Sequence, residues 1–292
     1  MKNMPKIKQK LIFFWLGALA VVAIFIWLAV FAKANSANLK VDFLDVGQGK
    51  AVFIEERGGS QILIDGGPDS SVLEKLSGVM PYYDRQIDLL ILTHPDADHL
   101  AGLIEVVKRY SVGKIIETGI ADPSADYQEW QRLIKEKNIP LVYALAGQKI
   151  KIGDDFSLEI LFPNRSLVGQ SFANTNSSSI VARMQYGKNS FLFTGDAEEP
   201  TEFYLTNSGA DIDSDILDVA HHGSKNSTGQ EFLEAVSPDV AVIQVGARNR
   251  YGHPAQEILD KLKNTKIYRT DLDGDIDFSC DIEKCYAQTG SK

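Results

Sequence analysis

The feature of this sequence that most constrains its fold is the run His94-Pro95-Asp96-Ala97-Asp98-His99, which brings four metal-binding side chains into one short segment. Residues 87–93, directly before it, form a short, branched and apolar run that is typical of a buried strand. Residues 100–110, directly after it, carry apolar side chains at helical spacing. We therefore expect the four ligands on a tight loop between a strand and a helix, where side chains often carry function.

The donor atoms of this loop indicate which cations it suits. His94 and His99 offer imidazole nitrogens, whereas Asp96 and Asp98 offer carboxylate oxygens. This mixture suits Zn²⁺, Mn²⁺ or Fe²⁺ better than Ca²⁺ or Mg²⁺. The alternative is an Asp-rich helix cap with incidental histidines, but four alternating ligand residues favour a metal-binding loop.

The charge of the chain is unevenly distributed. The formal net charge is −9, and residues 1–35 hold five lysines and no acidic residue, so the remainder carries −14. This sign weighs mildly against a polyanionic substrate, although acids gathered around metal ions would explain part of it. With 44% hydrophobic and 24% charged residues, the body of the chain is globular rather than disordered.

The N-terminal segment predicts a membrane anchor. Residues 1–10 are a basic head, and residues 11–32 contain no charged side chain. As a helix with a rise of about 1.5 Å per residue, the second segment spans a hydrocarbon core of about 30 Å. A signal peptide cleaved near Ala32-Lys33-Ala34 is the alternative, but signal cores usually have only about 7–15 residues. The lysines before the span favour a single-pass protein with a cytoplasmic N-terminus and an extracytoplasmic catalytic domain.

The rest of the chain is expected to consist of a linker, residues 33–38, and one catalytic domain, residues 39–292. The two cysteines, Cys280 and Cys285, fit an oxidising exterior and could pair, but two free thiols fit their spacing equally well. The acidic run at 271–277 is expected to form a hairpin turn, because Gly274 is misplaced for a calcium-binding loop.

Alternating strand and helix patterns predict an α/β (α+β) fold with two packed sheets and helices outside them. Strands are expected at residues 39–46, 51–54, 61–64, 87–93, 114–118, 141–144, 157–161, 179–185, 190–194, 216–220, 240–245, 266–270 and 275–279. Helices are expected at residues 100–110, 124–137, 198–207, 230–236 and 255–263.

Polar clusters follow the ends of four apolar strands, at Asp65, residues 94–99, Asp196, and His221-His222. Strand ends on one rim of a sandwich converge, so these side chains can reach one site. Paired histidines after a buried strand seldom serve packing, because both imidazoles need polar partners. The candidate ligands exceed the needs of one ion, so we expect two ions about 3.5–4 Å apart that activate a water molecule.

In their order and spacing, motifs within residues 39–280 resemble the metallo-β-lactamase superfamily, and most closely the metallo-β-lactamase-like domain of the ComEC competence (DNA-uptake) proteins. The motifs are Asp45-Val46-Gly47-Gln48-Gly49, Asp65-Gly66-Gly67, the 94–99 run, Asn176-Ser177-Ser178-Ser179-Ile180-Val181, Thr194-Gly195-Asp196-Ala197-Glu198, His221-His222-Gly223-Ser224, Tyr251-Gly252-His253-Pro254 and Thr270-Asp271-x-x-Gly274. The resemblance implies a four-layer αββα sandwich, preceded here by one transmembrane helix, with a dinuclear metal site along one rim.

The resemblance also implies a ligand for each position of two divalent ions, Zn²⁺ or Mn²⁺. The ligands would be His94 and Asp96 for one ion, Asp98 and His99 for the other, Asp196 as the bridge, and one of His221 and His222 to complete the second set. We favour His222 as the ligand and His221 as a contact to a substrate phosphoryl oxygen, but the reverse order is also open.

By the same resemblance, the residues that would support the ligands are Asp65, Asn176 and Ser179. Asp65 would fix the orientation of a ligand or of the loop. Asp96 stands where most relatives have the second His, and the usual third-motif His is missing. Asn176 or Ser179 occupies that region, so the first ion would have fewer nitrogen ligands and would bind weakly or prefer Mn²⁺.

Catalytic roles follow from the same resemblance. Asp98 could orient or deprotonate the attacking water, and His253 could either protonate a leaving oxygen or simply stack in its loop. Ser224, Lys225 and Asn226 are expected to open the next helix, where they would bind a phosphate oxygen or merely cap the helix.

These inferences predict a membrane-anchored, extracytoplasmic metal-dependent hydrolase, a phosphodiesterase or nuclease that acts on DNA in competence-type uptake. One alternative is a hydrolase of small phosphodiesters, lactones or amides. Another is a catalytically vestigial binding module of a DNA-uptake channel. Since one membrane span cannot form a pore, any transport role would require a separate channel protein.

Overall fold

The computed structural model describes residues 6–34 and 38–290 and divides the chain into two compact units, residues 1–37 and 38–292. In the first unit, helix α1 covers Lys6–Ala34. Among the described helices, it alone is long and apolar enough to cross a membrane, through its segment Lys10–Trp27. Parts of the expected basic head (1–5) and linker (35–37) lie outside the described residues.

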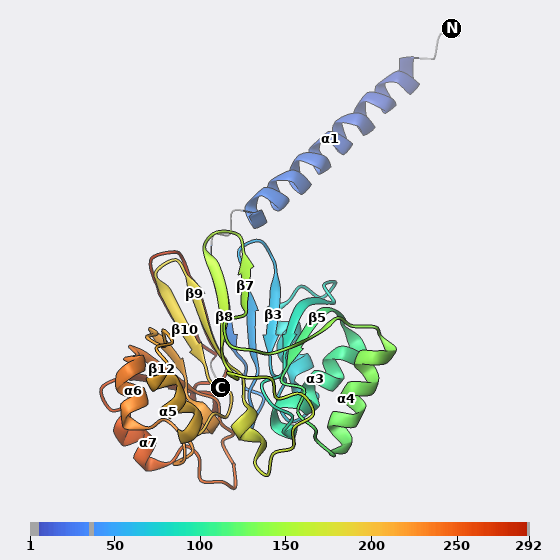
Figure 1. The fold of residues 1–292 in the computed structure, drawn as a ribbon. Helices are drawn as coiled ribbons and strands as arrows, with labels where there is room; N and C mark the ends of the chain where they lie inside the picture. The colour runs from blue at the N-terminus through green and yellow to red at the C-terminus, as the bar shows by residue number, and fades with distance from the viewer. Residues whose placement is uncertain (1–5, 35–37, 291–292) are drawn as a thin grey trace. The chain divides into compact units, whose positions relative to one another are not determined.

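Two mixed sheets form the centre of the second unit (Figure 1). The first sheet contains, in spatial order, β15 (Cys285–Thr289), β14 (Ile276–Cys280), β1 (Leu39–Phe43), β2 (Val52–Glu55), β3 (Gln61–Ile64), β4 (Gln86–Ile91), β5 (Ser111–Glu117) and β6 (Leu141–Tyr143). The second sheet contains β13 (Lys266–Arg269), β12 (Val240–Ile243), β11 (Ile216–Asp218), β10 (Asn189–Phe193), β9 (Val181–Tyr186), β8 (Phe156–Phe162) and β7 (Lys149–Ile152). In the first sheet, strands β1 to β3 pair antiparallel and strands β3 to β6 pair parallel. In the second sheet, strands β7 to β10 pair antiparallel and strands β10 to β13 pair parallel.

Helices cover the outer face of each sheet. The helices packed on the first sheet are α2 (Ser71–Val79), α3 (Ala97–Arg109) and α4 (Ala125–Glu136). Those packed on the second are α5 (Glu199–Asn207), α6 (Gln230–Val236) and α7 (Gln256–Lys261). Shorter helices are η1 (Thr175–Ser178), η2 (Ala220–Gly223) and α8 (Thr270–Asp273). The expected αββα arrangement is therefore confirmed.

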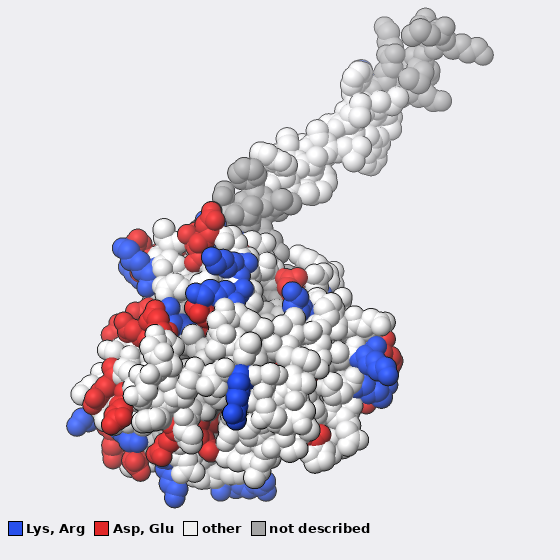
Figure 2. All heavy atoms as spheres, viewed as in Figure 1, with Lys and Arg blue, Asp and Glu red and all other residues white. Residues whose placement is uncertain are grey.

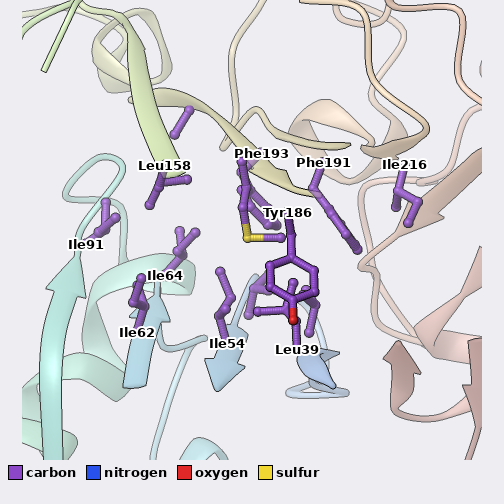
Figure 3. Packing of buried hydrophobic residues seen from close by; sticks show 14 of the residues in the cluster. Leu39, Ile54, Ile62, Ile64, Ile91, Leu158, Tyr186, Phe191, Phe193 and Ile216 are labelled. Atoms are coloured by element: carbon purple, nitrogen blue, oxygen red, sulfur yellow. The ribbon is translucent and has the colours of Figure 1, made fainter. Parts of the chain in front are cut away.

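The main core lies between the two sheets, because alternate residues of each strand point inward. In Figure 3, Ile54, Ile62 and Ile64 of the first sheet face Leu158 and Phe193 of the second. Separate apolar clusters fill the space between each sheet and its helices. This packing holds the two sheets in a fixed relation, so residues that follow strands of both sheets can form one site.

The carboxyl ends of parallel strands carry the candidate ligands. Strand β3 leads to Asp65 and its parallel neighbour β4 leads to the 94–99 segment, while β10 leads to Asp196 and its parallel neighbour β11 leads to η2. Sites in α/β sheets lie at this end of the strands, where connecting loops leave the sheet.

Three local expectations differ from the structure. Helix α3 begins at Ala97 with Asp96 as its N-cap, so Asp98 and His99 lie in its first turn rather than in a loop. The hairpin expected at 271–277 was wrong: after α8 the chain crosses from β13 in one sheet to β14 in the other. Two acidic residues of that run bind Arg269, whose main-chain N–H donates to Asp273 (2.8 Å) and whose guanidinium donates to Asp271 (2.9 Å). The patterns also failed to predict α2, β7 and β15.

The two cysteines form a disulfide. Cys280 and Cys285 occupy facing positions of the antiparallel strands β14 and β15. The strand register therefore decides between the two alternatives that the spacing left open.

Candidate metal centre

All five histidines of the sequence gather in one cluster. The ring centroids of His94 and His99 are 4.1 Å apart, and those of His99 and His222 are 5.6 Å apart. His221 lies 6.2 Å from His222 and 5.5 Å from His253. Because these residues come from both halves of the chain, the cluster joins the rims of the two sheets.

A close approach of two glycines brings the end of β3 against helix α3. A Cβ atom on Gly102 would lie 1.7 Å from the carbonyl oxygen of Gly66, so no side chain fits there. The N–H of Gly66 donates to the carbonyl of His99 (2.8 Å), and that of Gly102 donates to the carbonyl of Gly67 (3.0 Å). The Asp-Gly-Gly motif thus sets Asp65 beside His99.

The hydrogen bonds of His99 and His222 define which ring nitrogen is free. His99 donates through Nδ1 to Asp65 Oδ2 (2.7 Å), and His222 donates through Nδ1 to the carbonyl oxygen of Gln244 (2.8 Å). A carbonyl oxygen only accepts, so Nδ1 of His222 carries a proton. In the neutral form of each ring, Nε2 then has a free lone pair.

His94 has the same arrangement. The hydroxyl of Thr93 donates to Asp65 Oδ2 (2.8 Å) and therefore accepts from His94 Nδ1 (3.1 Å). Ser179 Oγ lies 3.3 Å from the same nitrogen and accepts from the N–H of Asp196 (3.1 Å). Burial, reinforced by His99, lowers the pKa of His94 to about 3, so its ring is neutral. Its Nε2 lone pair is free as well.

The three Nε2 atoms converge with two carboxylates. His99 Nε2 lies 3.2 Å from Asp196 Oδ1, and His222 Nε2 lies 3.2 Å from Asp98 Oδ2 and 3.5 Å from Asp196 Oδ2. The ligand atoms of His94, His99 and Asp196 all lie within 4.8 Å of one another, as do those of Asp98, His99 and His222. His99 belongs to both groups, so its Nε2 lies within reach of either metal position.

Several of these buried atoms lack a hydrogen-bond partner in the described part of the chain. They are Nε2 of His94, His99 and His222, and Oδ1 of Asp196. An unsatisfied polar atom in a protein interior costs about 1–3 kcal/mol, so four in one place call for another partner. Nitrogen lone pairs and carboxylate oxygens are the donors that Zn²⁺ and Mn²⁺ accept, so these residues fit a divalent metal.

The electrostatics of the centre also favour a cation. Its carboxylates are Asp65, Asp96, Asp98 and Asp196. Burial favours a neutral His222, but the Asp196 and Asp98 carboxylates together outweigh burial and raise the pKa of His222 to about 9. Burial also favours a neutral Asp98, yet His222 and His99 lower the pKa of that carboxyl to about 2. A divalent cation satisfies the same attraction for positive charge, and its binding releases the protons.

Asp96 lies at the edge of the group. Its Oδ2 is 3.7 Å from His94 Nε2, its Oδ1 accepts a hydrogen bond from Thr175, and its side chain is 41% exposed. Neither residue considered for the missing third histidine adds a ligand to the groups above. Ser179 contacts His94 Nδ1, and Asn176 contacts Glu198 Oε1 (3.3 Å) and the His221 ring.

His221 and His222 play different parts. Both have left-handed backbone conformations, with φ of 50° and 55°, which cost non-glycine residues of the order of 1–3 kcal/mol each. This turn points His222 into the centre, whereas His221 lies farther out, with Nε2 3.8 Å from Asp196 Oδ2 and Nδ1 3.4 Å from Glu198 Oε1.

The remaining candidates lie around this core. Ser224, Lys225 and Asn226 do not open a helix, because they lie in the turn after η2 and α6 begins only at Gln230. Ser224 is buried, and the other two are exposed. His253 stacks beside the cluster, and burial together with His222 and His221 lowers its pKa to about 4.

The sequence patterns did not single out three residues that shape the centre. Thr93 binds both Asp65 and His94, Glu198 faces His221, and Gln244 positions His222 through its main-chain carbonyl. Thr93 directly precedes the 94–99 run and Glu198 is the last residue of the Thr194–Glu198 motif, so the sequence offered a signal for both. A main-chain carbonyl has no sequence signal.

Comparison with known proteins bears on the same residues. The family model described as "Metallo-beta-lactamase superfamily" matches residues 44–247. The chain is 33% identical over 267 residues to ComE operon protein 3 of Bacillus subtilis, which covers 83% of this chain and 33% of that protein. It is 30% identical over 241 residues to competence protein ComA of Neisseria gonorrhoeae, covering 80% and 31% of the two chains. The chain thus spans about a third of the length of these curated relatives.

A solved structure has the same fold. The metallo-beta-lactamase fold protein YhfI from Bacillus subtilis matches with a TM-score of 0.55 and 14% identity, covering 86% of this chain and 100% of that one. At this identity the likeness concerns the fold alone. Together with the sequence matches, it confirms the resemblance that the motifs indicated.

Proposed function

The chain belongs to the metallo-β-lactamase superfamily, and from this membership we propose that residues 39–292 form a dinuclear metal-dependent phosphodiesterase that cleaves DNA. The observation that carries the proposal is the arrangement of His94, His99 and His222. Each ring has Nδ1 occupied by a protein oxygen and a free Nε2 directed towards acidic side chains. A helix cap or a packing role requires none of these features.

The proposed ligands are those that the motifs imply, namely His94 and Asp96 for one ion, Asp98, His99 and His222 for the other, and Asp196 for both. Divalent cations bound there supply Lewis-acid activation of water and stabilise charge on a phosphoryl oxygen. Zn²⁺ and Mn²⁺ both suit these donors, and the two carboxylates beside His94 favour Mn²⁺ in the first position.

The protein's own residues then orient the reacting groups. Asp98 is one-third exposed at its side chain, so one carboxylate oxygen can hold the attacking water while the other stays near His222. His221 is partly exposed at the rim, and Glu198 and Asn176 hold its ring, so it is placed to contact a substrate oxygen. His253 is neutral near pH 7, which disfavours the proton-donor role considered for it.

The competence role and the membrane position extend the same proposal. The similarity to competence protein ComA supports a role in competence, and we place the catalytic domain outside the cell, anchored by α1 with the N-terminus in the cytoplasm. DNA transport would then belong to a separate channel protein. A protease added to intact cells should remove residues 38–292 and leave the N-terminus protected; protection of both parts would refute this orientation.

Nuclease activity is tested on the full-length protein in detergent, stripped of metal and reloaded with Mn²⁺ or Zn²⁺. We expect cleavage of labelled DNA, and a loss of at least about 100-fold in Asp98→Asn, which removes a charged ligand. Asp126→Asn is the matched control, because Asp126 lies in the first turn of α4 as Asp98 lies in that of α3. Metal-loaded protein that hydrolyses a lactone or an amide but no phosphodiester would overturn the proposal.

A further inference from the structure

The segment from Gly246 to Pro254 lies beside the metal centre and carries two arginines and an exposed tyrosine. A cavity of about 400 Å³ opens there, and its lining includes Asp98, Gln48, Arg248, Arg250 and Tyr251. Because Asp98 is a proposed metal ligand, this cavity adjoins the proposed metal centre.

Asn249 gives the segment a defined shape. Its side-chain oxygen accepts from the N–H groups of Tyr251 (3.2 Å) and His253 (3.0 Å), and its nitrogen donates to the carbonyls of Gly246 (2.9 Å) and His253 (2.7 Å). Four hydrogen bonds from one side chain fix the loop, so Tyr251 is presented by a rigid support.

The Tyr251 ring continues a series of nearly parallel rings that leads to the metal ligands. It lies 5.8 Å from the His253 ring at an interplanar angle of 25°, and His253 lies 6.3 Å from the His222 ring at 21°. Tyr251 therefore lies two ring-to-ring steps from His222, one of the proposed metal ligands.

Exposure alone does not distinguish Tyr251. Its side chain is 56% exposed, but Tyr82 and Tyr83 are 84% and 70% exposed in the turn before β4, at the opposite end of that strand from the ligands. Tyr251 differs because it lines the cavity at the metal centre and because Arg250 lies over its ring, 5.3 Å from the centroid. Guanidinium and phenol planes both stack on nucleobases.

The positive charge here runs against the trend of the domain. Residues 36–292 carry a formal charge of −14, and Figure 2 shows acidic side chains gathered over the part of the molecule that contains α5, α6 and α7. Arg248 and Arg250 are both exposed, and within the described residues neither has a carboxylate partner. Two uncompensated cations beside a cluster of acids suit a ligand that carries phosphates.

We propose that Arg250 and Tyr251 form a stacking platform for an unpaired nucleobase, while Arg248 contacts the adjacent backbone phosphate. The inference rests on the proposed phosphodiesterase function and names its substrate as single-stranded nucleic acid. A base that stacks on a side chain must leave its own duplex, so paired DNA binds this platform only at frayed ends.

Fluorescence anisotropy tests the platform without relying on cleavage. The metal-loaded, full-length protein in detergent is titrated into labelled oligonucleotides with hydrolysis-resistant phosphorothioate linkages. Removing one base–aromatic stack should weaken binding of the single strand by roughly 5- to 100-fold in Tyr251→Ala. Tyr251→Phe keeps the ring and should bind like the wild type, as should the exposed control Tyr82→Ala.

Two further probes separate base from phosphate. An oligonucleotide built of abasic sugars should bind wild type and Tyr251→Ala equally, because it offers no base to stack. Arg248→Gln should weaken binding of both the ordinary and the abasic oligonucleotide. It should also reduce the salt dependence of their affinity by about one phosphate contact.

The outcomes separate this inference from the proposed function. If Tyr251→Ala weakens single-strand binding as expected but the protein hydrolyses no phosphodiester, the nuclease function is refuted and the stacking platform is supported. Hydrolysis of DNA with Tyr251→Ala indistinguishable from wild type, or equal binding of single strands and blunt duplexes, would overturn the platform and leave the nuclease standing.

Discussion

Asp65 accepts a hydrogen bond from His99 Nδ1 at 2.7 Å and thereby directs the opposite nitrogen of that ring towards Asp196. The same carboxylate accepts from the main chain and the hydroxyl of Thr93, each at 2.8 Å. One buried side chain therefore sets the orientation of two neighbouring histidines, directly for His99 and through Thr93 for His94.

We expect Asp65→Asn to weaken metal binding by about 10- to 100-fold, because the partner that orients His99 loses its charge. Competition with a calibrated chelator measures this affinity in the full-length protein. Asp69→Asn is the control, since Asp69 is exposed in the same loop and its carboxylate accepts from the N–H of Ser71 (2.8 Å). An unchanged affinity in Asp65→Asn would show that the contact does not position a ligand.

The proposed position of Asp196 between the two metal ions predicts unequal metal losses. We expect two metal ions per chain in the wild type, about one in His94→Ala, His99→Ala or His222→Ala, and a loss of both in Asp196→Ala, because Asp196 alone is proposed as a ligand of both ions. Elemental analysis after gel filtration gives these ratios. If Asp196→Ala retains one ion with full occupancy, Asp196 is a ligand of a single ion and does not bridge the two.

Asp42 predicts a pH dependence of stability that does not involve the metal centre. Burial, then the charge of Asp277 on the facing position of β14, raises the pKa of Asp42 to about 7. Between pH 4 and 7 the folded chain holds a proton that the unfolded chain releases, so this residue makes the free energy of unfolding fall as pH rises through that range.

Asp42→Asn should therefore stabilise the protein at pH 8, by at most about 4 kcal/mol, and have little effect at pH 4. Thermal unfolding at both pH values measures the difference between variant and wild type, in which any contribution of bound metal cancels. Asp154→Asn, which changes an exposed residue, should show no such trend. A difference that stays constant from pH 4 to 8 would contradict the expected protonation of Asp42.

A buried ion pair supports the turn that carries His222. Lys50 Nζ donates to Asp218 Oδ2 and to the carbonyl of Val219, each at 2.9 Å, and the two charged side chains are 2% and 3% exposed. Gln244 Nε2 donates to the other oxygen of Asp218 (3.2 Å), and its main-chain carbonyl holds His222.

Lys50→Met should destabilise the protein by about 3–5 kcal/mol, because it leaves the Asp218 carboxylate buried without its counter-charge. Adding Asp218→Asn should restore part of that loss, since the remaining amide is neutral. Denaturant unfolding of both single variants and the double variant measures the coupling. Additive losses would show that the two residues do not act as a pair.

Local signals were enough to predict most strands and helices, the apolar N-terminal helix and the residues that would meet at the rim. The alternation in β8 and the helical spacing in α3 and α4 are properties of a few consecutive residues, so they can be recognised without the fold. The prediction of a hairpin at 271–277 was wrong because the turn residues of this run suit a hairpin, but β13 and β14 on either side of it belong to different sheets. Strand partners are set by distant residues that a local pattern does not contain.

By itself, the sequence determined the chemistry available at this centre: the identity of every donor, the order of the motifs, and their attachment to strand ends. Only the tertiary structure decided which histidine nitrogen is free, that His222 rather than His221 points inward, and that the two cysteines pair. These outcomes depend on main-chain carbonyls, left-handed turns and strand register. They arise when segments far apart in the chain come into contact, and so no short stretch of residues encodes them alone.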